Sequence, residues 1–201
     1  MGNPNQGEAV VIREETEIFF TSDLHLGHTN IIHHCKRPFS STEEMDETLI
    51  QNWNKVVGPD DIAYILGDFA LAHPRRIESY LGRLVGEKHL IRGSHDRKLQ
   101  QNILARFASI HDLLTIRVPD PDAPGKQRFI VLCHYAMRTW DHSHHGSWHL
   151  YGHSHGNLPE NPYSLSFDIG VDCWNYRPVS YAQVKEKMLA SLAQKEACRS
   201  S

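Results

Sequence analysis

The amino-acid sequence predicts an α/β fold built on two sheets. Short apolar runs recur along the chain, and most of them end abruptly in aspartate, histidine or glycine. Helical segments separate the first three runs, and this order is typical of parallel strands joined by crossover helices. The second half of the chain is richer in strands. An α/β sandwich with two sheets accommodates both halves.

Seven segments have the length and apolar character of strands. They are residues 17–22, 61–66, 88–92, 113–118, 128–133, 148–151 and 164–169. Three helices are indicated by their first residues. Ser41 and Glu44 have the spacing of a capping box, Pro74 suits a first helical turn, and Ser180 with Gln183 could cap the last helix.

Length and composition are those of an ordinary globular chain. The 201 residues suit one domain, residues 1–201 with a core of about 17–196, and 40% of them are hydrophobic. The formal net charge of −3 does not indicate a nonspecific nucleic-acid binder, although nucleic acid stays possible as a partner. Histidine is the unusual residue, with 15 copies, and it is the commonest metal ligand in proteins.

Cysteine spacing and the N-terminal sequence indicate a cytoplasmic location. The cysteines, Cys35, Cys133, Cys173 and Cys198, form no C-x-x-C pair, so a disulfide framework or a cysteine-rich zinc site is not expected. The stretch MGNPNQGEAVVIREE contains no apolar signal core, and no apolar run reaches transmembrane length. We therefore expect no membrane association.

Polar residues with metal-binding chemistry follow five of the predicted strands. They are Asp23-Leu24-His25, Gly67-Asp68, Gly93-Ser94-His95-Asp96, His134 and Gly152-His153-Ser154-His155. Each piece alone has an ordinary explanation, such as a polar strand end, a helix N-cap or a core histidine. Together they offer two carboxylates and several imidazoles at the edge where ligands bind in α/β sheets. Such a set could hold two metal ions, with one carboxylate between them.

The order D-x-H, G-D, G-N-H-D, H, G-H-x-H resembles the signature of the calcineurin-like metallophosphoesterases. This chain has DLH at 23–25, GD at 67–68, GSHD at 93–96, His134 and GHSH at 152–155. The resemblance spans residues 23 to 155. It implies a four-layer α/β/β/α sandwich, with two mixed sheets flanked by helices.

The resemblance also implies a role for each matching residue. Two divalent transition-metal ions (Mn, Fe, Zn, Ni or Co) would be bound, and the donor types do not choose among these metals. His95 would face the substrate and protonate the leaving oxygen, and Asp96 would support the local geometry. The first ion would be held by Asp23, His25 and His155, the second by His134, His153 and residue 94, and Asp68 would bridge the two.

Ser94 stands where the family has an asparagine that binds the second metal. Its hydroxyl sits on a shorter arm and is a poorer ligand than an amide carbonyl. Three interpretations are open: a natural variant that binds directly or through water, a weak second site, or an introduced change that disables the enzyme. We expect second-metal affinity to fall by about 10–100-fold.

Substrate contacts are expected from residues next to these motifs. His28 follows His25 by three residues and could touch a phosphate oxygen, and Arg37 lies in a basic stretch beside an aromatic residue. Arg138, Trp140 and the histidine-rich loop at 141–149 could line the pocket or cover it. Asp172 could close the site from the last strand.

The resulting prediction is a hydrolase that splits a phosphodiester or a small phosphomonoester with a metal-activated hydroxide. One alternative is a nuclease or nucleotide phosphatase using the same site. Another is a non-enzymatic interaction module. Leu71 occupies the position where protein phosphatases of this superfamily have an aspartate, which argues against a Ser/Thr protein phosphatase. The sequence does not determine the oligomeric state.

Overall fold

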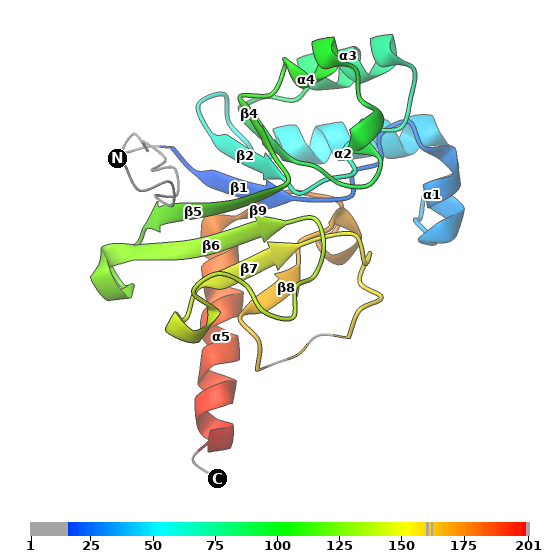
Figure 1. Ribbon diagram of the computed structural model, residues 1–201. Helices are drawn as coiled ribbons and strands as arrows, with labels where there is room; N and C mark the ends of the chain where they lie inside the picture. Colours follow the sequence, from blue (N-terminus) through cyan, green and yellow to red (C-terminus); the bar gives the residue numbers. More distant parts are fainter. Residues whose placement is uncertain (1–15, 160, 162, 200–201) are drawn as a thin grey trace.

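The computed structural model describes residues 16–159, 161 and 163–199, and it is an α/β fold with two mixed sheets flanked by helices (Figure 1). The N-terminal stretch used to predict a cytoplasmic location lies outside the described residues, as do both ends of the predicted 1–201 domain. In the part of the chain that is described, no helix has the length and apolar character needed to cross a membrane.

The first sheet contains the N-terminal strands in parallel. Its strand order is β4-β3-β2-β1-β9, with β9 antiparallel to β1 and the other neighbours parallel. Helices connect β1 to β2 and β2 to β3, as the strand–helix–strand order predicted. The strands are β1 (Ile18–Thr21), β2 (Ile62–Ile65), β3 (Glu87–Ile91), β4 (Ser109–His111) and β9 (Val179–Ser180). The helices are α1 (Thr29–His34), α2 (Thr42–Asn54), α3 (Pro74–Arg83) and α4 (Gln101–Leu104).

The second sheet has the order β5-β6-β7-β8. An antiparallel pair, β5 with β6, is continued by parallel neighbours β7 and β8. These strands are β5 (Leu113–Pro119), β6 (Gln127–Cys133), β7 (Trp148–Tyr151) and β8 (Ser166–Asp168), and the chain ends in α5 (Tyr181–Arg199). Short 3₁₀ turns are η1 (Asp96–Lys98), η2 (Pro124–Lys126), η3 (Ser143–His145) and η4 (Val171–Cys173).

Alternating side chains of the first sheet divide the apolar interior into two cores. Phe19 on β1 packs with the helix-side core, whereas its neighbour Phe20 packs between the two sheets. This follows from the two-residue period of a strand. Val184 and Met188 of α5 also belong to the core between the sheets. Burial on both faces holds β1 rigidly, and β1 leads directly into Asp23.

Local sequence signals placed most elements correctly. All seven predicted strands are present, and the Ser41 hydroxyl accepts a hydrogen bond from the Glu44 amide at the start of α2. Ser180 and Gln183 cap α5 reciprocally. Four short elements, β4, β9, α1 and α4, were not predicted, because none is longer than six residues and none has a clear apolar period.

Candidate metal centre

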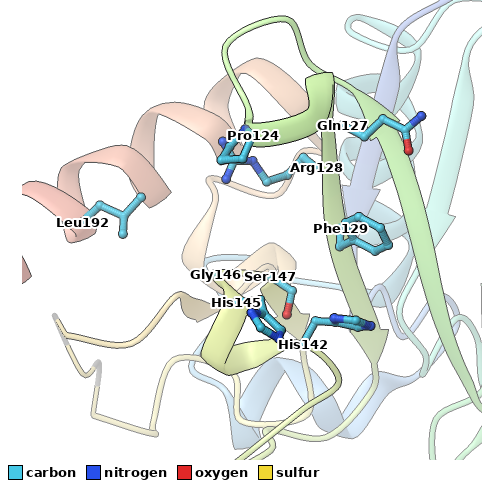
Figure 2. Close-up of a pocket in the computed structure, with 9 residues that line it drawn as sticks. All are labelled: Pro124, Gln127, Arg128, Phe129, His142, His145, Gly146, Ser147 and Leu192. Atoms are coloured by element: carbon cyan, nitrogen blue, oxygen red, sulfur yellow. The ribbon is translucent and has the colours of Figure 1, made fainter.

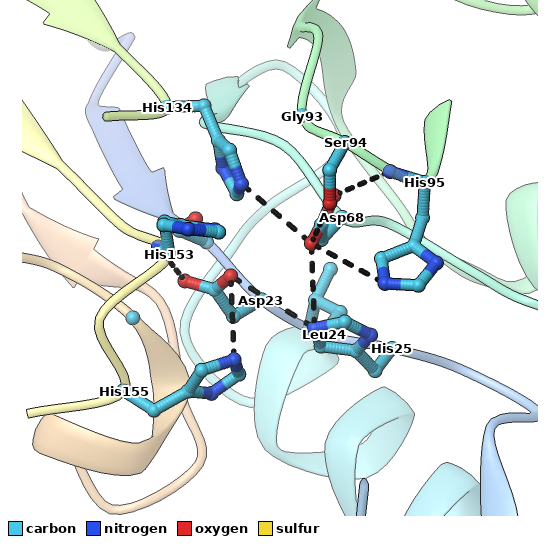
Figure 3. A network of polar contacts seen from close by, with 12 residues as sticks. Asp23, Leu24, His25, Asp68, Gly93, Ser94, His95, His134, His153 and His155 are labelled. Carbon is cyan, nitrogen blue, oxygen red and sulfur yellow. Dashed lines mark hydrogen bonds and ion pairs between the residues drawn. The ribbon is translucent and has the colours of Figure 1, made fainter. Parts of the chain in front are cut away.

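The predicted ligands meet at one edge of the two sheets, beyond the carboxyl ends of the strands (Figure 3). Asp23 and His25 follow β1, and Asp68 follows β2. From the second sheet, His134 follows β6, and the two histidines of the G-H-x-H motif follow β7. Residues separated by as many as 130 positions are therefore in direct contact, as the bond from the His153 amide to Asp23 Oδ2 (2.9 Å) shows.

Backbone hydrogen bonds continue past the strand ends and hold the ligand segments side by side. The Asp23 amide donates to the Gly67 carbonyl (3.0 Å), and the His25 amide donates to the Asp68 carbonyl (2.9 Å). The buried Asp96 carboxylate accepts from the amides of Gly93 (2.8 Å), Asp68 (2.7 Å) and Phe69 (3.0 Å). Asp96 thus ties the segment after β3 to the segment after β2.

Five of the predicted ligands have left-handed backbone conformations. The φ angles are 58° for Asp23, 50° for His25, 51° for Asp68, 67° for His153 and 47° for His155. A non-glycine residue in this region costs of order 1–3 kcal/mol, and such strain gathers at functional sites. The surrounding hydrogen bonds hold these residues in conformations that aim their side chains at one another.

One group of potential ligands comprises Asp23, His25 and His155, hereafter the first group. Their ligand atoms lie within 4.8 Å of one another. Asp23 Oδ1 is 3.9 Å from Nε2 of His25 and 3.9 Å from Nε2 of His155. Ligands that each lie about 2.0–2.2 Å from one ion are separated from each other by about 3–4 Å. The first group therefore has the spacing of a metal site.

A second group comprises Asp68, His134 and His153, whose ligand atoms also lie within 4.8 Å of one another. Asp68 Oδ2 is 3.6 Å from His134 Nε2 and 3.6 Å from His25 Nε2, so this oxygen stands between the two groups. A carboxylate in that position has the geometry of a bridging ligand. The first group has the members that the resemblance implies for the first ion, and the second group has those implied for the second ion except residue 94.

Hydrogen bonds to the far side of two imidazoles fix which nitrogen is free to bind a metal. His134 Nδ1 lies 2.7 Å from the Leu66 carbonyl, and a carbonyl can only accept. The hydrogen is therefore on Nδ1, and Nε2 keeps its lone pair toward Asp68. His155 Nδ1 lies 2.7 Å from Asp172 Oδ2, which directs its Nε2 toward Asp23 in the same way.

Several of the predicted ligand atoms are buried and lack a hydrogen-bond partner. In the described part of the chain, seven buried side-chain polar atoms are unpaired, and three of them are Asp23 Oδ1, His25 Nε2 and His134 Nε2. Leaving such an atom unpaired costs roughly 1–3 kcal/mol. These three unpaired atoms face one small region, and carboxylate oxygen and imidazole nitrogen are ligands that suit transition metals. The site could therefore bind a cation.

Burial and mutual charge shift the pKa values of these ligands. Burial raises the pKa of Asp23 to about 6, even though His155 and His134 oppose the shift. Burial also acts to raise the pKa of Asp68, but contacts with His134 and with the His95 amide outweigh it, and the pKa is lowered. The pKa of His134 is raised despite burial, because Asp68 and Asp23 attract its proton. In the absence of a cation, these side chains therefore compete for protons.

Ser94 and His95 lie on the solvent side of Asp68. The Ser94 hydroxyl is 3.1 Å from Asp68 Oδ2 and 3.3 Å from Oδ1, so it donates to the predicted bridging carboxylate. His95 Nε2 is 3.9 Å from Asp68 Oδ2, and its side chain is 34% exposed. The geometry would also let His95 act as a ligand with His25 and Asp68. Its exposure places it where a substrate can reach it.

The structure separates the two predicted substrate-binding residues. His28 lies beside the metal groups: its Nδ1 is 3.2 Å from His25 Nδ1, and its ring is 5.6 Å from that of His95. Arg37 does not fit its predicted role of holding a phosphate. Its side chain is fully buried, and its guanidinium makes five hydrogen bonds, all within the protein. It has no donor left for a substrate.

The histidine-rich loop does not cover the metal groups. The His142 ring lies against that of Phe129 near the start of β6, at the opposite end of that strand from His134. The Trp140 ring contacts that of His149 in β7. The loop instead borders a separate cavity of about 390 Å³ (Figure 2). That cavity is lined by Pro124, Gln127, Arg128, Phe129, His142, His145, Gly146, Ser147 and Leu192, and it contains none of the predicted ligands.

Relatives of the chain are found in an archaeon and in bacteriophages. A Methanocaldococcus jannaschii protein, "Uncharacterized protein MJ1445", is 35% identical over 171 residues, which are 82% of this chain and 86% of that protein. The gene 66 protein of Mycobacterium phage L5 is 30% identical over 181 residues, 78% of this chain and 86% of the phage protein. No family model matches the chain.

The fold is also present in a solved structure. The Aquifex aeolicus protein AQ665, described as a protein of unknown function, matches with a TM-score of 0.63 at 22% identity. The match covers 85% of this chain and 98% of AQ665. The match shows that this fold recurs in another protein.

Proposed function

We propose that this chain, which belongs to the same family as MJ1445 and the phage L5 gene 66 protein, is a metal-dependent phosphoesterase. The observation that supports this most strongly is the convergence of unpaired, buried ligand atoms from Asp23, His25 and His134, which follow the ends of two strands, β1 and β6, in different sheets. Their order along the chain and their spatial grouping agree with the metallophosphoesterase motifs.

The first group would hold one divalent cation and the second group another, with Asp68 shared between them. Mn, Fe, Zn, Ni and Co are all compatible with these nitrogen and oxygen donors. Two such ions would activate a water molecule and withdraw charge from the phosphate oxygens. The protein's contribution is a rigid cradle, because each ligand follows a strand or is held by a backbone hydrogen bond.

His95 is the residue best placed to act on the leaving group. It is partly exposed, and its Nε2 lies 3.9 Å from Asp68 Oδ2, next to the metal groups. From there it can donate a proton to the departing ester oxygen and donate a hydrogen bond to the phosphoryl group. His28 stands next to it and can contact a second phosphate oxygen. The substrate would be a phosphodiester or a small phosphomonoester.

Metal analysis combined with two chromogenic substrates tests the proposal. The full chain, dialysed with and without added Mn²⁺, is analysed for metal and assayed on bis(p-nitrophenyl) phosphate and p-nitrophenyl phosphate. We expect bound metal and hydrolysis of at least one ester, and both should be lost in Asp68→Asn. Asp120→Asn is a matched control, because Asp120 is also a buried carboxylate but belongs to neither group. A chain that binds no metal under either condition would favour an interaction module.

A further inference from the structure

We propose that Arg37 and Asp172 are positioning residues for the first group, acting on His155 through its far nitrogen and on Asp23 through its backbone. This inference rests on the proposed function, because it concerns how the first cation's ligands are held. Neither residue belongs to the motifs that carry the family resemblance, and they are 135 positions apart in the sequence.

Asp172 fixes the orientation of His155. Its Oδ2 lies 2.7 Å from His155 Nδ1, and the Asp172 side chain is 8% exposed. An imidazole whose Nδ1–H is held by a carboxylate cannot turn its ring, and its Nε2 lone pair becomes a better donor to a metal. That Nε2 is the atom that lies 3.9 Å from Asp23 Oδ1. Asp172 therefore decides where His155 presents its ligand atom.

Arg37 in turn fixes Asp172 by a two-point contact. Its Nε donates to Oδ1 at 2.8 Å and one terminal nitrogen donates to Oδ2 at 2.8 Å. This bidentate geometry sets both the position and the plane of the carboxylate. A lysine could keep the charge but could not reproduce the planar contact.

The same guanidinium also holds the backbone that carries the other two ligands of the first group. It donates to the Asp23 carbonyl at 2.7 Å and to the Leu24 carbonyl at 3.1 Å. Asp23 and His25 have left-handed φ angles of 58° and 50°, so this segment needs support to keep its shape. The buried guanidinium of Arg37 thus links the segment after β1 to η4, which contains Asp172. Through Asp172 it also supports the segment after β7.

A direct metal-binding role for Asp172 is disfavoured by the same contacts. Cys35, His155 and Asp172 offer ligand atoms within 4.8 Å of one another. Both Asp172 oxygens, however, already accept hydrogen bonds from Arg37. A metal ion held by these three residues would lie close to the positive charge of the Arg37 guanidinium. In a buried setting the repulsion between the two charges is strong. Asp172 acts on the metal through His155 instead.

A purely structural role would give a different experimental result. Arg37 also contacts Met45 Sδ (3.4 Å), and its loss could destabilise the fold without any selective effect on metal binding. The deciding measurement is therefore the affinity for one cation at a time. The His153→Ala background removes a ligand of the second group and leaves the first group's side chains intact.

The test compares Asp172→Asn and Arg37→Lys with the Asp120→Asn control, each in the His153→Ala background. Asp120 is 1% exposed and accepts a hydrogen bond from Lys185 (2.6 Å), so it matches Asp172 in burial and in having a cationic partner. Mn²⁺ affinity is measured by titration calorimetry, and Co²⁺ absorption spectra record the coordination geometry. Thermal melting of the metal-free proteins records stability.

We expect Mn²⁺ affinity to fall about 10–100-fold in Asp172→Asn and in Arg37→Lys, with an altered Co²⁺ spectrum, and to stay unchanged in Asp120→Asn. Unchanged affinity in both variants would overturn the inference while leaving the proposed function intact. If Asp172→Asn does not fold, Arg37→Lys alone decides between these results. If the parent protein binds no metal even without the His153→Ala change, the proposed function and the inference both fail.

Discussion

At the scale of single residues, Ser94 is the position where this chain departs from the motif it resembles. Its hydroxyl donates to the oxygens of Asp68 at 3.1 Å and 3.3 Å, and its side chain is exposed. We predict that Ser94→Asn raises affinity for the second cation about 10–100-fold, because an amide carbonyl on a longer arm is a better ligand. Metal stoichiometry and titration calorimetry measure this directly. Equal affinities in the two proteins would show that a water already completes the second site.

His95 provides a second prediction at this scale. His95→Asn should lower kcat by about 10²–10⁴-fold, because the proton donor for the leaving oxygen is lost. Metal content should remain that of the parent, since His95 lies outside both groups that we assign to the cations. The loss should be smaller for a substrate with a very acidic leaving group, which needs no proton. A fall in bound metal to half would instead identify His95 as a ligand, as its distance of 3.9 Å to Asp68 Oδ2 would permit.

Single residues also show where sequence analysis fails. The ligand motifs were recognised because aspartate or histidine follows each of five apolar runs, in an order that resembles a known family. Arg37 was predicted to contact a phosphate of the substrate, because a basic residue beside an aromatic one looks the same in sequence whether it is exposed or buried. Asp172 was noticed, but its partner was not. A contact between residues 135 positions apart leaves no local pattern in one sequence.

At the scale of elements, the ends of four strands approach so closely that only glycine fits between them. A Cβ atom on Gly152 would collide with Ser22 and with the carboxylate of Asp23. A Cβ atom on Gly93 would collide with Asp68 Oδ1 and with the Asp68 amide. The glycines in G-D, G-S-H-D and G-H-S-H therefore let β2, β3 and β7 bring their ligands within reach of β1.

We predict that Gly152→Ala weakens metal binding and destabilises the fold by about 1–3 kcal/mol, because the methyl group must push Asp23 aside. Gly82→Ala in α3 is the matched control. Apart from its chain neighbours and the backbone of its own helix, no described heavy atom lies within 4 Å of the position of its added methyl, and alanine in a helix should stabilise by roughly 0.5–1 kcal/mol. Chemical denaturation and metal titration of both variants test this. Normal metal affinity in Gly152→Ala would show that the segment after β1 tolerates the displacement.

Element prediction depended on length. All strands of four or more residues were predicted from their apolar runs. The two-residue β9 was not, because its pairing with β1 is set by the fold around it. The three-residue β4 carries a serine and a histidine and looks polar in sequence. Both lie at the edges of the first sheet, where tertiary contacts outweigh local preference.

At the scale of the whole molecule, the parallel order of β1, β2 and β3 and the convergence of their ends could be predicted from the sequence. Crossover connections force parallel strands, and parallel strands bring their carboxyl ends to one edge. The way in which the second sheet faces the first could not be predicted, because it depends on the shared core that Phe20, Trp148 and Phe167 build between them. That core brings His134, His153 and His155 to the edge where Asp23 and Asp68 end.

The coupling of metal binding to global stability leads to a prediction about pH. Burial raises the pKa of Asp23 to about 6, and the pKa of His155 is raised despite burial by its contacts with Asp172 and Asp23. The pKa of His134 is raised as well. Below about pH 6 the metal-free protein therefore holds protons on ligands that a cation needs in deprotonated form. Metal binding must release these protons, so affinity falls as pH falls.

The expected result is a metal-induced rise in melting temperature that is large at pH 7.5 and shrinks toward pH 5.5. A cation at 100 times its Kd stabilises the folded state by about 2.7 kcal/mol, and a 100-fold weaker Kd reduces this to about 0.4 kcal/mol. The measured quantity is the difference in Tm between Mn²⁺-loaded and EDTA-treated protein at each pH. The effect on Tm of titrating groups away from the site is the same in both samples and cancels in this difference. Asp120→Asn should show the same pH dependence. A difference that is constant with pH, or that grows toward acid, would mean that Asp23, His134 and His155 are not the groups displaced by metal.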